Sequence, residues 1–338
     1  MSNPETYTGY AFKQKGGKLE KVTFDWKDPQ DGEVVVKVLA CGVCGSDEMV
    51  ENVGMPIVQL PRVPGHEIVG EIVAVGPNEE KWKVGERVGG GWHGGHCFTC
   101  DYCRAGEFNI CEKEEVNGNS MDGGYAEYST LRSEALVPVP TDMDPAEAAP
   151  FLCAGVTVFN SLRNMSTKPG DIVAVQGIGG LGHLAIQFAK KMGFRTVALS
   201  SSPSKKELFE KLGIDEYIDG SKEDQGNALQ KLGGAKVIMC TAMSAKAMEG
   251  LIDGLGLDGQ LLVLSFPKDS VPLYAPALIS KRLSIRGFPS GKPKDIEETF
   301  EFMNTNGVRC LVENFPLEKA QEAYEHRAKA RFRAVIVP

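Results

Sequence analysis

Four cysteines stand close together in the first third of the chain, with the spacing C-x2-C-x2-C-x7-C: Cys97, Cys100, Cys103 and Cys111. Four thiolates in one loop can close a tetrahedron around Zn²⁺ and leave no open position, which is the arrangement of a structural zinc site. Two disulfides or an iron–sulfur cluster could use the same residues. We expect the neighbouring His93 and His96 to be polar surface residues outside this site.

The cysteine count favours a metal over disulfides. The chain has nine cysteines, an odd number, and four of them are clustered in one loop. A secreted disulfide scaffold would be shorter and would spread its pairs along the chain. We therefore expect a reducing, cytoplasmic location and a zinc ion that holds the irregular segment Gly94–Glu115 in place.

A second set of metal-ligating residue types is scattered along the chain: Cys44, His66, Glu67 and Cys153. One imidazole and two thiolates make a three-ligand zinc site whose fourth position stays open for water or substrate, which is a catalytic arrangement. Spacing alone cannot bring such distant residues together. From spacing alone, buried structural cysteines and a hydrogen-bonded histidine are the better explanation of these residues.

The segment from Gly177 to Gly182 matches G-x-G-x-x-G, with glycines at positions 177, 179 and 182 and with Gly180 and Leu181 between the last two. It follows a short apolar strand predicted over 171–176 and opens an apolar helix predicted over 181–192, which is the context of a dinucleotide-binding turn. Such glycines permit a tight turn, close approach to a pyrophosphate and close packing of helix on strand. The phosphates then meet the free N–H groups of a helix N-terminus.

The next strand, predicted over 196–199, ends in a segment that distinguishes between the two nicotinamide dinucleotides. An NAD site places Asp or Glu there to bind the ribose 2′-hydroxyl. Between the end of this strand and Glu207 there is no carboxylate. The segment instead offers hydroxyl and ammonium groups, at Ser200, Ser201, Ser202, Lys205 and Lys206. These groups suit a 2′-phosphate. We therefore predict NADP(H) rather than NAD(H).

The elements that must position these residues differ between two parts of the chain. The first part has short Val- and Ile-rich strands separated by Gly and Pro, predicted over 33–39, 68–75, 83–88, 125–130 and 135–139. A helical stretch over 145–162, interrupted at Gly155, is followed by alternating strands and helices, with further strands over 235–240 and 260–264. That alternation indicates a parallel sheet. Helices over 296–304 and 317–329 and a strand over 332–337 complete the chain.

Composition excludes several classes of protein. The 338 residues are 42% hydrophobic and 24% charged, as in globular proteins of two domains. A net charge of −8 argues against nucleic acid or an anionic membrane as a partner. No stretch is long and apolar enough for a membrane span, and the polar segment Met1–Lys15 is unlike a secretory signal.

The chain resembles the zinc-containing medium-chain alcohol dehydrogenases over essentially its whole length. Five segments carry the resemblance in their order and spacing: GVCGSD at 42–47, GHE at 65–67, the four-cysteine segment, LCAG at 152–155 and GIGGLG at 177–182. Within this family, SSSPSK at 200–205 is similar to the NADP-binding segment of cinnamyl alcohol dehydrogenases. The length is closer to that of the short microbial members.

The resemblance implies an α/β protein: a GroES-like, partly barrel-like β catalytic domain over 1–152 and 289–338, and a doubly wound Rossmann domain that binds NADP over 153–288. It also implies two zinc ions per subunit. The catalytic ion would be held by Cys44, His66 and Cys153, with Glu67 as an outer or alternative ligand. Asp47 would orient His66 through a hydrogen bond.

The resemblance further implies alcohol–aldehyde interconversion in which zinc acts as a Lewis acid on the substrate oxygen. Ser46 matches the hydroxyl that takes the alcohol proton, and Thr157 matches a residue near the nicotinamide. Aldehyde reduction is the expected direction in the cell. The chain departs from many relatives at Gly45 and Met49, where they carry histidines, so the proton relay is expected to be short. This leaves open an NADPH-dependent reduction of α,β-unsaturated carbonyl double bonds; a third alternative is a binding protein that has lost catalysis.

The expected partner is therefore a small alcohol or aldehyde, without nucleic acid or membrane. Relatives form dimers and tetramers, often through edge pairing of their Rossmann sheets, and we expect a homodimer or homotetramer.

Overall fold

A computed structural model describes residues 3–201 and 203–338 of the chain. The chain divides into two compact units, one formed by residues up to Val156 with Ser290–Phe302 and Arg309–Pro338, the other by Thr157–Pro289 with Met303–Val308. Within the described residues, no helix combines the length and the apolar character that a membrane crossing requires.

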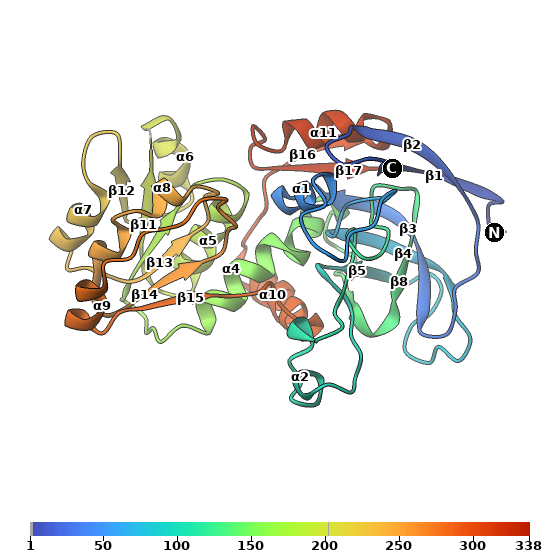
Figure 1. Ribbon diagram of the computed structural model, residues 1–338, viewed down its shortest axis with the longest axis horizontal. Coiled ribbons are helices and arrows are strands. Elements are labelled where there is room, and N and C mark those ends of the chain that lie inside the picture. Colours follow the sequence, from blue (N-terminus) through green and yellow to red (C-terminus); the bar gives the residue numbers. More distant parts are fainter. Residues whose placement is uncertain (1–2, 202) are drawn as a thin grey trace. The chain divides into compact units, whose positions relative to one another are not determined.

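The first unit is built mainly on antiparallel strands, with a parallel pair, β16 and β17. Its largest sheet has the order β16-β17-β3-β4-β5-β9, with β8 also paired to β3 (Figure 1). Two small two-stranded sheets, β1-β2 and β6-β7, accompany it. The strands are β1 Thr6–Phe12, β2 Leu19–Asp25, β3 Glu33–Gly42, β4 Ile68–Val75, β5 Arg87–Gly90, β6 His93–Gly95, β7 Glu115–Val116, β8 Tyr128–Arg132, β9 Leu136–Pro138, β16 Val312–Pro316 and β17 Arg333–Val337.

Strand β3 is the centre of this sheet because it pairs with β4, β8 and β17. Its residues are buried on both faces over most of its length, as expected of a central strand. The register against β4 shifts at two places, between Val35 and Val36 and between Val38 and Ala40. Such irregularities bend a strand and increase its twist, which lets the sheet curve toward a barrel.

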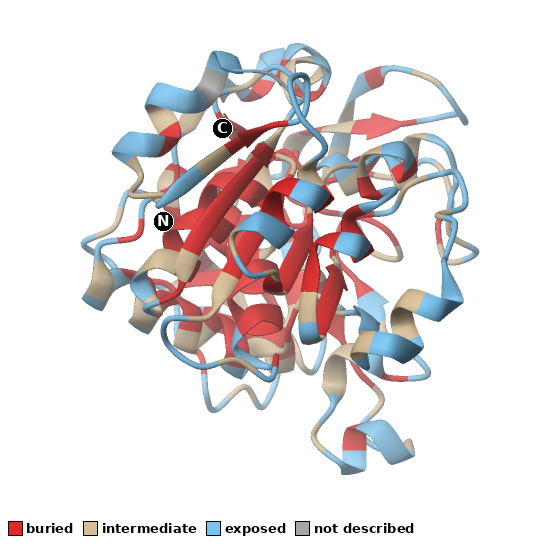
Figure 2. Ribbon diagram, turned by 90° about the vertical axis from the view of Figure 1, so that its left-hand side faces the viewer, coloured by how far each residue is buried: buried red, intermediate tan, exposed pale blue. Residues whose placement is uncertain are grey.

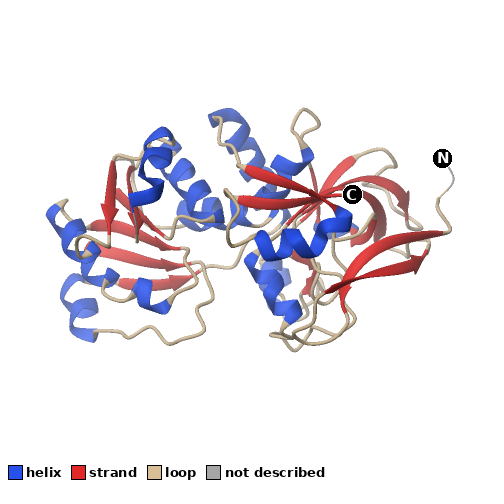
Figure 3. Ribbon diagram, turned by 90° about the horizontal axis from the view of Figure 1, so that it is seen from above, coloured by secondary structure: helices blue, strands red, loops and turns tan. Residues whose placement is uncertain are grey.

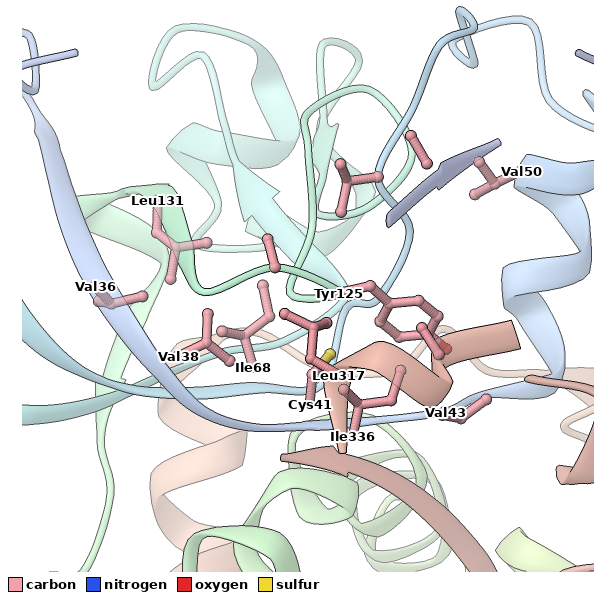
Figure 4. Packing of buried hydrophobic residues seen from close by; sticks show 14 of the residues in the cluster. Val36, Val38, Cys41, Val43, Val50, Ile68, Tyr125, Leu131, Leu317 and Ile336 are labelled. Carbon is pink, nitrogen blue, oxygen red and sulfur yellow. The ribbon is translucent and has the colours of Figure 1, made fainter. Parts of the chain in front are cut away.

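The core of the first unit lies against this curved sheet. Side chains from β3, β4, β17 and the short 3₁₀ turn Leu317–Lys319 pack together, including Val36, Ile68, Leu317 and Ile336, and the helix α11 (Ala320–His326) follows that turn (Figure 4). The remaining helices of the unit are short: α1 Glu48–Glu51, α2 Asp101–Arg104 and α3 Pro145–Ala148. The helices α4 (Ala154–Arg163) and α10 (Pro293–Asn306) each contribute to both units.

The second unit contains a six-stranded sheet in which every pair is parallel, in the order β12-β11-β10-β13-β14-β15. The chain moves outward from β10 to β12 and then starts again beside β10 and moves the other way. Right-handed crossovers therefore place helices on opposite faces of the sheet (Figure 3). The strands are β10 Ile172–Gln176, β11 Arg195–Ser200, β12 Glu216–Asp219, β13 Ala235–Cys240, β14 Leu255–Val263 and β15 Ser284–Gly287.

The helices of this unit are α5 Gly180–Lys191, α6 Lys206–Lys211, α7 Gln225–Lys231, α8 Ala245–Met248 and α9 Ala275–Lys281. The inner strands are buried, as the red arrows of Figure 2 show. The edge strand β15 and the helix α9 contain no buried residue. The predicted fold class, a GroES-like β domain with a doubly wound parallel-sheet domain, is confirmed by this topology.

Candidate active site and metal centres

The four clustered cysteines converge on one point. The Sγ atoms of Cys97 and Cys103 lie 4.0 Å apart, and those of Cys100 and Cys111 lie 3.9 Å apart. A tetrahedral zinc with Zn–S bonds of about 2.3 Å has sulfur–sulfur edges of about 3.8 Å, so these positions fit one ion. The sulfurs are not bonded to each other, which removes the disulfide alternative in this structure.

The loop itself supplies hydrogen bonds that suit thiolates. Backbone N–H groups of Cys97, Cys100 and Lys113 donate to cysteine sulfurs over 3.3–3.4 Å. The pKa of Cys97 is lowered to about 5, chiefly by the Thr99 hydroxyl and by backbone donors. Burial raises the pKa of Cys103 to about 12. A cation at the centre would remove this imbalance because it favours the ionised form of all four.

The expectation that His93 and His96 are polar surface residues is wrong. Both are buried, and His93 Nε2 lies 3.0 Å from His96 Nδ1 while His93 Nδ1 lies 3.0 Å from a carboxylate oxygen of Glu114. The His96 ring also stacks on Phe108 at 4.1 Å between centroids. These contacts replace the apolar core that the loop lacks, so the two histidines brace the four-cysteine segment.

The second, scattered set of residues also comes together. One ligand atom from each of its four members lies within 4.8 Å of every other: Cys44, His66, Glu67 and Cys153. The turns that follow β3 and precede β4 carry the first three, and Cys153 lies at the break before α4. The helical conformation is interrupted at Cys153, where φ is −133° and ψ is −71°. The predicted interruption at Gly155 is wrong, because Gly155 lies inside α4.

The side chains of this second site influence one another's pKa values. A hydrogen bond from Cys153 and the nearby His66 hold the pKa of Cys44 well below its usual range against the effect of burial. The same contact with Cys44 raises the pKa of Cys153. Burial lowers the pKa of His66, but Asp47 and Cys44 outweigh it and raise that pKa. A thiolate at Cys44 is a group that binds a cation, and metal binding to such a set of ligands releases the protons that they carry.

Ser46 borders the ligand atoms. Its Oγ donates to Cys44 Sγ over 3.1 Å and lies 3.3 Å from His66 Nε2. Trp92 packs against the imidazole of His66 in an edge-to-face arrangement, with centroids 5.0 Å apart. A hydroxyl and an aromatic wall thus stand beside the two ligand side chains.

Behind His66 lies the buried carboxylate of Asp47. Its Oδ1 is 3.2 Å from His66 Nδ1, within ion-pair distance. Its Oδ2 accepts hydrogen bonds from the Cys44 backbone N–H over 2.9 Å and from the Tyr125 hydroxyl over 2.7 Å. The sequence-based expectation is a hydrogen bond from Asp47 that orients His66; Asp47 Oδ1 and His66 Nδ1 lie within ion-pair distance, but neither has a hydrogen-bond partner among the described residues.

Glu67 forms a buried ion pair with Arg333 of β17. Burial raises the pKa of Glu67 to about 7, although the Arg333 guanidinium acts in the opposite direction. Glu67 Oε1 is engaged by Arg333, whereas Oε2 has no hydrogen-bond partner among the described residues. This buried carboxylate oxygen lies beside two cysteines and a histidine. Together these groups are donors of the kinds that bind a zinc ion.

The glycine turn of the second unit lies where the strand order reverses, between β10 and β13, which is where doubly wound sheets bind ligands. Gly177 has a positive φ of 86°, and a Cβ there would lie 2.6 Å from Ala242 N. A Cβ at Gly182 would lie 2.0 Å from Gly177 O, whereas one at Gly179 would meet no heavy atom within 4 Å. The turn is therefore closely packed on one side and open at Gly179.

The predicted 2′-phosphate segment follows β11. Ser200 ends that strand, Ser201 is exposed, and Lys206 opens α6 with its Nζ 3.6 Å from a carboxylate oxygen of Glu210. Ser202 lies outside the described residues, and Lys205 belongs to a short 3₁₀ turn. Thr157 is buried in α4.

A carboxylate that the sequence did not single out, Asp219, pairs in register with Ser200 at the end of β12. Its oxygens are engaged by the Ser221 hydroxyl at 2.7 Å and by Lys222 at 3.8 Å. The hydrogen bonds from Ser221 lower the pKa of Asp219 and so favour its carboxylate form.

Comparison with known proteins decides the family. The model of the alcohol dehydrogenase GroES-like domain matches residues 30–141, and that of the zinc-binding dehydrogenases matches residues 180–305. An alcohol dehydrogenase of an Aspergillus species, notN, is 47% identical over 99% of both chains. The chain belongs to the zinc-type medium-chain alcohol dehydrogenase family.

Other members of this family cover the chain as fully. The alcohol dehydrogenase patD of Penicillium expansum is 48% identical over 99% of this chain and 98% of its own length. A probable cinnamyl alcohol dehydrogenase of Populus deltoides is 33% identical over 97% and 94% of the two chains. The solved structure of a cinnamyl alcohol dehydrogenase from Sorghum bicolor is similar with a TM-score of 0.90 and 30% identity, covering 98% and 97%.

Two residues that contact the candidate catalytic set escaped the sequence analysis. Arg333 is the one charge inside the apolar run 332–337, a pattern that could have marked it as a buried partner. Tyr125 lies in GGYAEY, where nothing in the sequence indicates that it meets Asp47. Both reach the site from strands or loops distant in the chain, as only the fold can arrange.

Proposed function

We propose that this medium-chain dehydrogenase is a zinc-dependent enzyme that interconverts alcohols with aldehydes or ketones using NADP(H), and that it reduces aldehydes in the cell. The observation that carries the proposal is the convergence of ligand atoms from Cys44, His66 and Cys153 within 4.8 Å of one another. Alcohol dehydrogenases similar over nearly the whole chain support the same reaction class.

In this proposal, Cys44, His66 and Cys153 hold the catalytic ion, and Glu67 is an outer or alternative ligand. Cys97, Cys100, Cys103 and Cys111 hold a second, structural ion, which makes two zinc ions per subunit. When bound, the catalytic zinc supplies Lewis acidity toward the substrate oxygen and the nicotinamide supplies or accepts the hydride.

Ser46 moves the proton. Its Oγ lies beside both Cys44 Sγ and His66 Nε2, so a substrate oxygen that approaches these ligand side chains comes within reach of the hydroxyl. In oxidation the hydroxyl accepts the alcohol proton, and in reduction it returns one. The next position along the relay is Met49 on α1, which cannot titrate, so water completes the path.

The choice of NADP(H) is supported by charge. No carboxylate stands at the end of β11 between Ser200 and Lys206, and the segment offers hydroxyl and ammonium groups to a 2′-phosphate. Asp219 on the neighbouring strand is already engaged by Ser221 and Lys222. The turn at Gly177, Gly179, Gly180, Leu181 and Gly182 would hold the pyrophosphate, and Thr157 would lie near the nicotinamide.

A second activity, reduction of the double bond of an α,β-unsaturated carbonyl, is favoured by the same Met49. Hydride addition to carbon needs less protonation at the carbonyl oxygen, so a shortened relay costs that reaction less. A binding protein without catalysis is the least favoured alternative, because the complete ligand set is retained.

Initial rates with NADPH and NADH against a panel of aldehydes, before and after treatment with a zinc chelator, test the proposal. We expect chelator-sensitive aldehyde reduction with a higher kcat/KM for NADPH. A cinnamaldehyde-like enal separates the two activities, because carbonyl reduction yields the unsaturated alcohol and double-bond reduction yields the saturated aldehyde. Equal activity without zinc would overturn the proposed role of the metal.

We further propose a homodimer or homotetramer in the cytoplasm, with residues 1–152 and 289–338 as the catalytic domain and 153–288 as the cofactor domain. Strand β15 lies at the edge of its sheet, so the backbone groups on one of its sides have no partner strand among the described residues. The same edge of a second copy could pair with it. Large apolar side chains are exposed in the same unit, at Leu257, Leu273, Tyr274, Ile279 and Ile285.

A further inference from the structure

The phenol of Tyr125 has no part in the chemistry above, although it lies close to the residues that would hold the catalytic zinc. Its side chain is 0% exposed, and its hydroxyl donates to Asp47 Oδ2 over 2.7 Å. The two residues are separated by 78 positions in the chain, so the fold, and not local sequence, creates this contact.

The two oxygens of Asp47 have different partners. Oδ2 accepts the hydroxyl of Tyr125 and the backbone N–H of Cys44, while Oδ1 lies 3.2 Å from His66 Nδ1. The carboxylate cannot rotate without giving up both donors at Oδ2. Because Oδ2 is held in this way, Oδ1 remains the oxygen that faces the imidazole.

The aromatic ring of Tyr125 is itself fixed in place. It belongs to the buried cluster of the first unit, where Figure 4 shows it among Val43, Leu317 and Ile336. Gly65, directly before His66, has a φ of 100°, and a Cβ there would lie 2.5 Å from Tyr125 Cδ1. The ring therefore fills the space that a side chain at position 65 would need, and its hydroxyl cannot swing to another acceptor.

We propose that Tyr125 is a positioning residue for the catalytic metal: it holds Asp47, and through Asp47 it fixes the ring of His66 so that Nε2 faces Cys44. The inference rests on the proposed function, because it concerns the same zinc ion. Outer partners of a metal-ligating histidine typically contribute 10- to 100-fold to metal affinity, because they set the ring orientation.

The test is the zinc affinity of the full-length protein, measured by competition with a chromophoric chelator. The four-cysteine site of the same molecule serves as an internal reference. Tyr125→Phe keeps the ring and removes only the donor, and we expect it to weaken zinc binding at the second site by about tenfold, at the lower end of that range. Binding at the four-cysteine site should stay unchanged.

Tyr324→Phe is the matched control. Tyr324 is also buried in the first unit, 3% exposed, and its hydroxyl donates to a carboxylate, Glu51 Oε2, over 2.6 Å. It contacts no member of the ligand set, so its loss should leave both zinc affinities as in the wild type. An equal loss of affinity in Tyr324→Phe and Tyr125→Phe would overturn the inference, because buried tyrosine hydroxyls would then act only through general stability.

The Asp47→Asn background decides whether Tyr125 acts through the carboxylate. We expect Asp47→Asn to weaken zinc binding, and we expect the double variant with Tyr125→Phe to bind zinc as Asp47→Asn does. A tenfold loss on adding Tyr125→Phe to Asp47→Asn, or no loss in Tyr125→Phe alone, would contradict the inference. If the proposed function itself were wrong, the outcome would be different: the wild-type protein would bind only one zinc per chain.

Discussion

Breaking the buried ion pair between Glu67 and Arg333 is expected to destabilise the first unit strongly. Arg333 is 5% exposed and Glu67 is 0% exposed, so neither charge can turn to water. Burial already raises the pKa of Glu67 to about 7 with the guanidinium in contact. Arg333→Met would leave the carboxyl group without its counter-charge, and removing one partner of a buried pair costs about 3–5 kcal/mol.

The assay can be confined to this unit, because all three tryptophans lie in it: Trp26, Trp82 and Trp92. Urea unfolding followed by tryptophan fluorescence, at matched zinc, should show a loss of about 3–5 kcal/mol for Arg333→Met. The exposed pair of Lys13 and Glu20, at 3.0 Å, is the control, and Lys13→Met should cost less than about 1 kcal/mol.

A double variant, Arg333→Met with Glu67→Gln, removes both charges. Since no unpaired charge is then buried, its loss should be about 2–3 kcal/mol smaller than the sum of the two single losses. The reasoning fails if Arg333→Met unfolds within about 1 kcal/mol of the wild type. It fails equally if the two single losses add in the double variant.

Three further changes test other parts of the account. Ser200→Asp places a carboxylate at the end of β11. Because this carboxylate would repel the 2′-phosphate, we expect kcat/KM to fall at least tenfold with NADPH and to stay unchanged with NADH. Unchanged kinetics with NADPH would show that the segment is not part of the cofactor site. Ser46→Ala should lower kcat by about 10²–10⁴-fold with both zinc ions retained, and a kcat within twofold of the wild type would exclude the hydroxyl from proton transfer. Ile279→Glu changes a side chain that is 79% exposed on α9 and should shift the protein toward monomers in sedimentation, whereas an unchanged mass would place the interface elsewhere.

Periodicity and turn residues predicted the elements whose burial is strong. The strand predicted over 68–75 has the same bounds as β4, and the C-terminal strand begins one residue later than predicted. Among the described residues, seven strands were not predicted: β1, β2, β6, β7, β12, β15 and β16. Strand β1 mixes threonine, tyrosine and glycine with two buried apolar residues, β2 buries only Leu19, and β15 is exposed throughout, so none of these three carries a continuous apolar pattern.

The candidate site was predicted only as far as the family resemblance reaches. Residue types and spacing indicated the four-cysteine site directly, because its ligands share one loop. The convergence of Cys44, His66 and Cys153 depends on how β3, β4 and the break before α4 meet, which no local pattern records. The apolar run 332–337 could have marked Arg333 as buried, but its contact with Glu67 depends on the antiparallel pairing of β17 with β3, which no local pattern records.

The most direct measurement is the zinc content of the purified protein together with its turnover, in the wild type and in Cys153→Ser. We expect two zinc ions per chain in the wild type. In Cys153→Ser we expect one zinc, retained by the four-cysteine loop, and no aldehyde reduction. One zinc per chain in a fully active wild-type enzyme, or full turnover in Cys153→Ser after loss of the second ion, would contradict it.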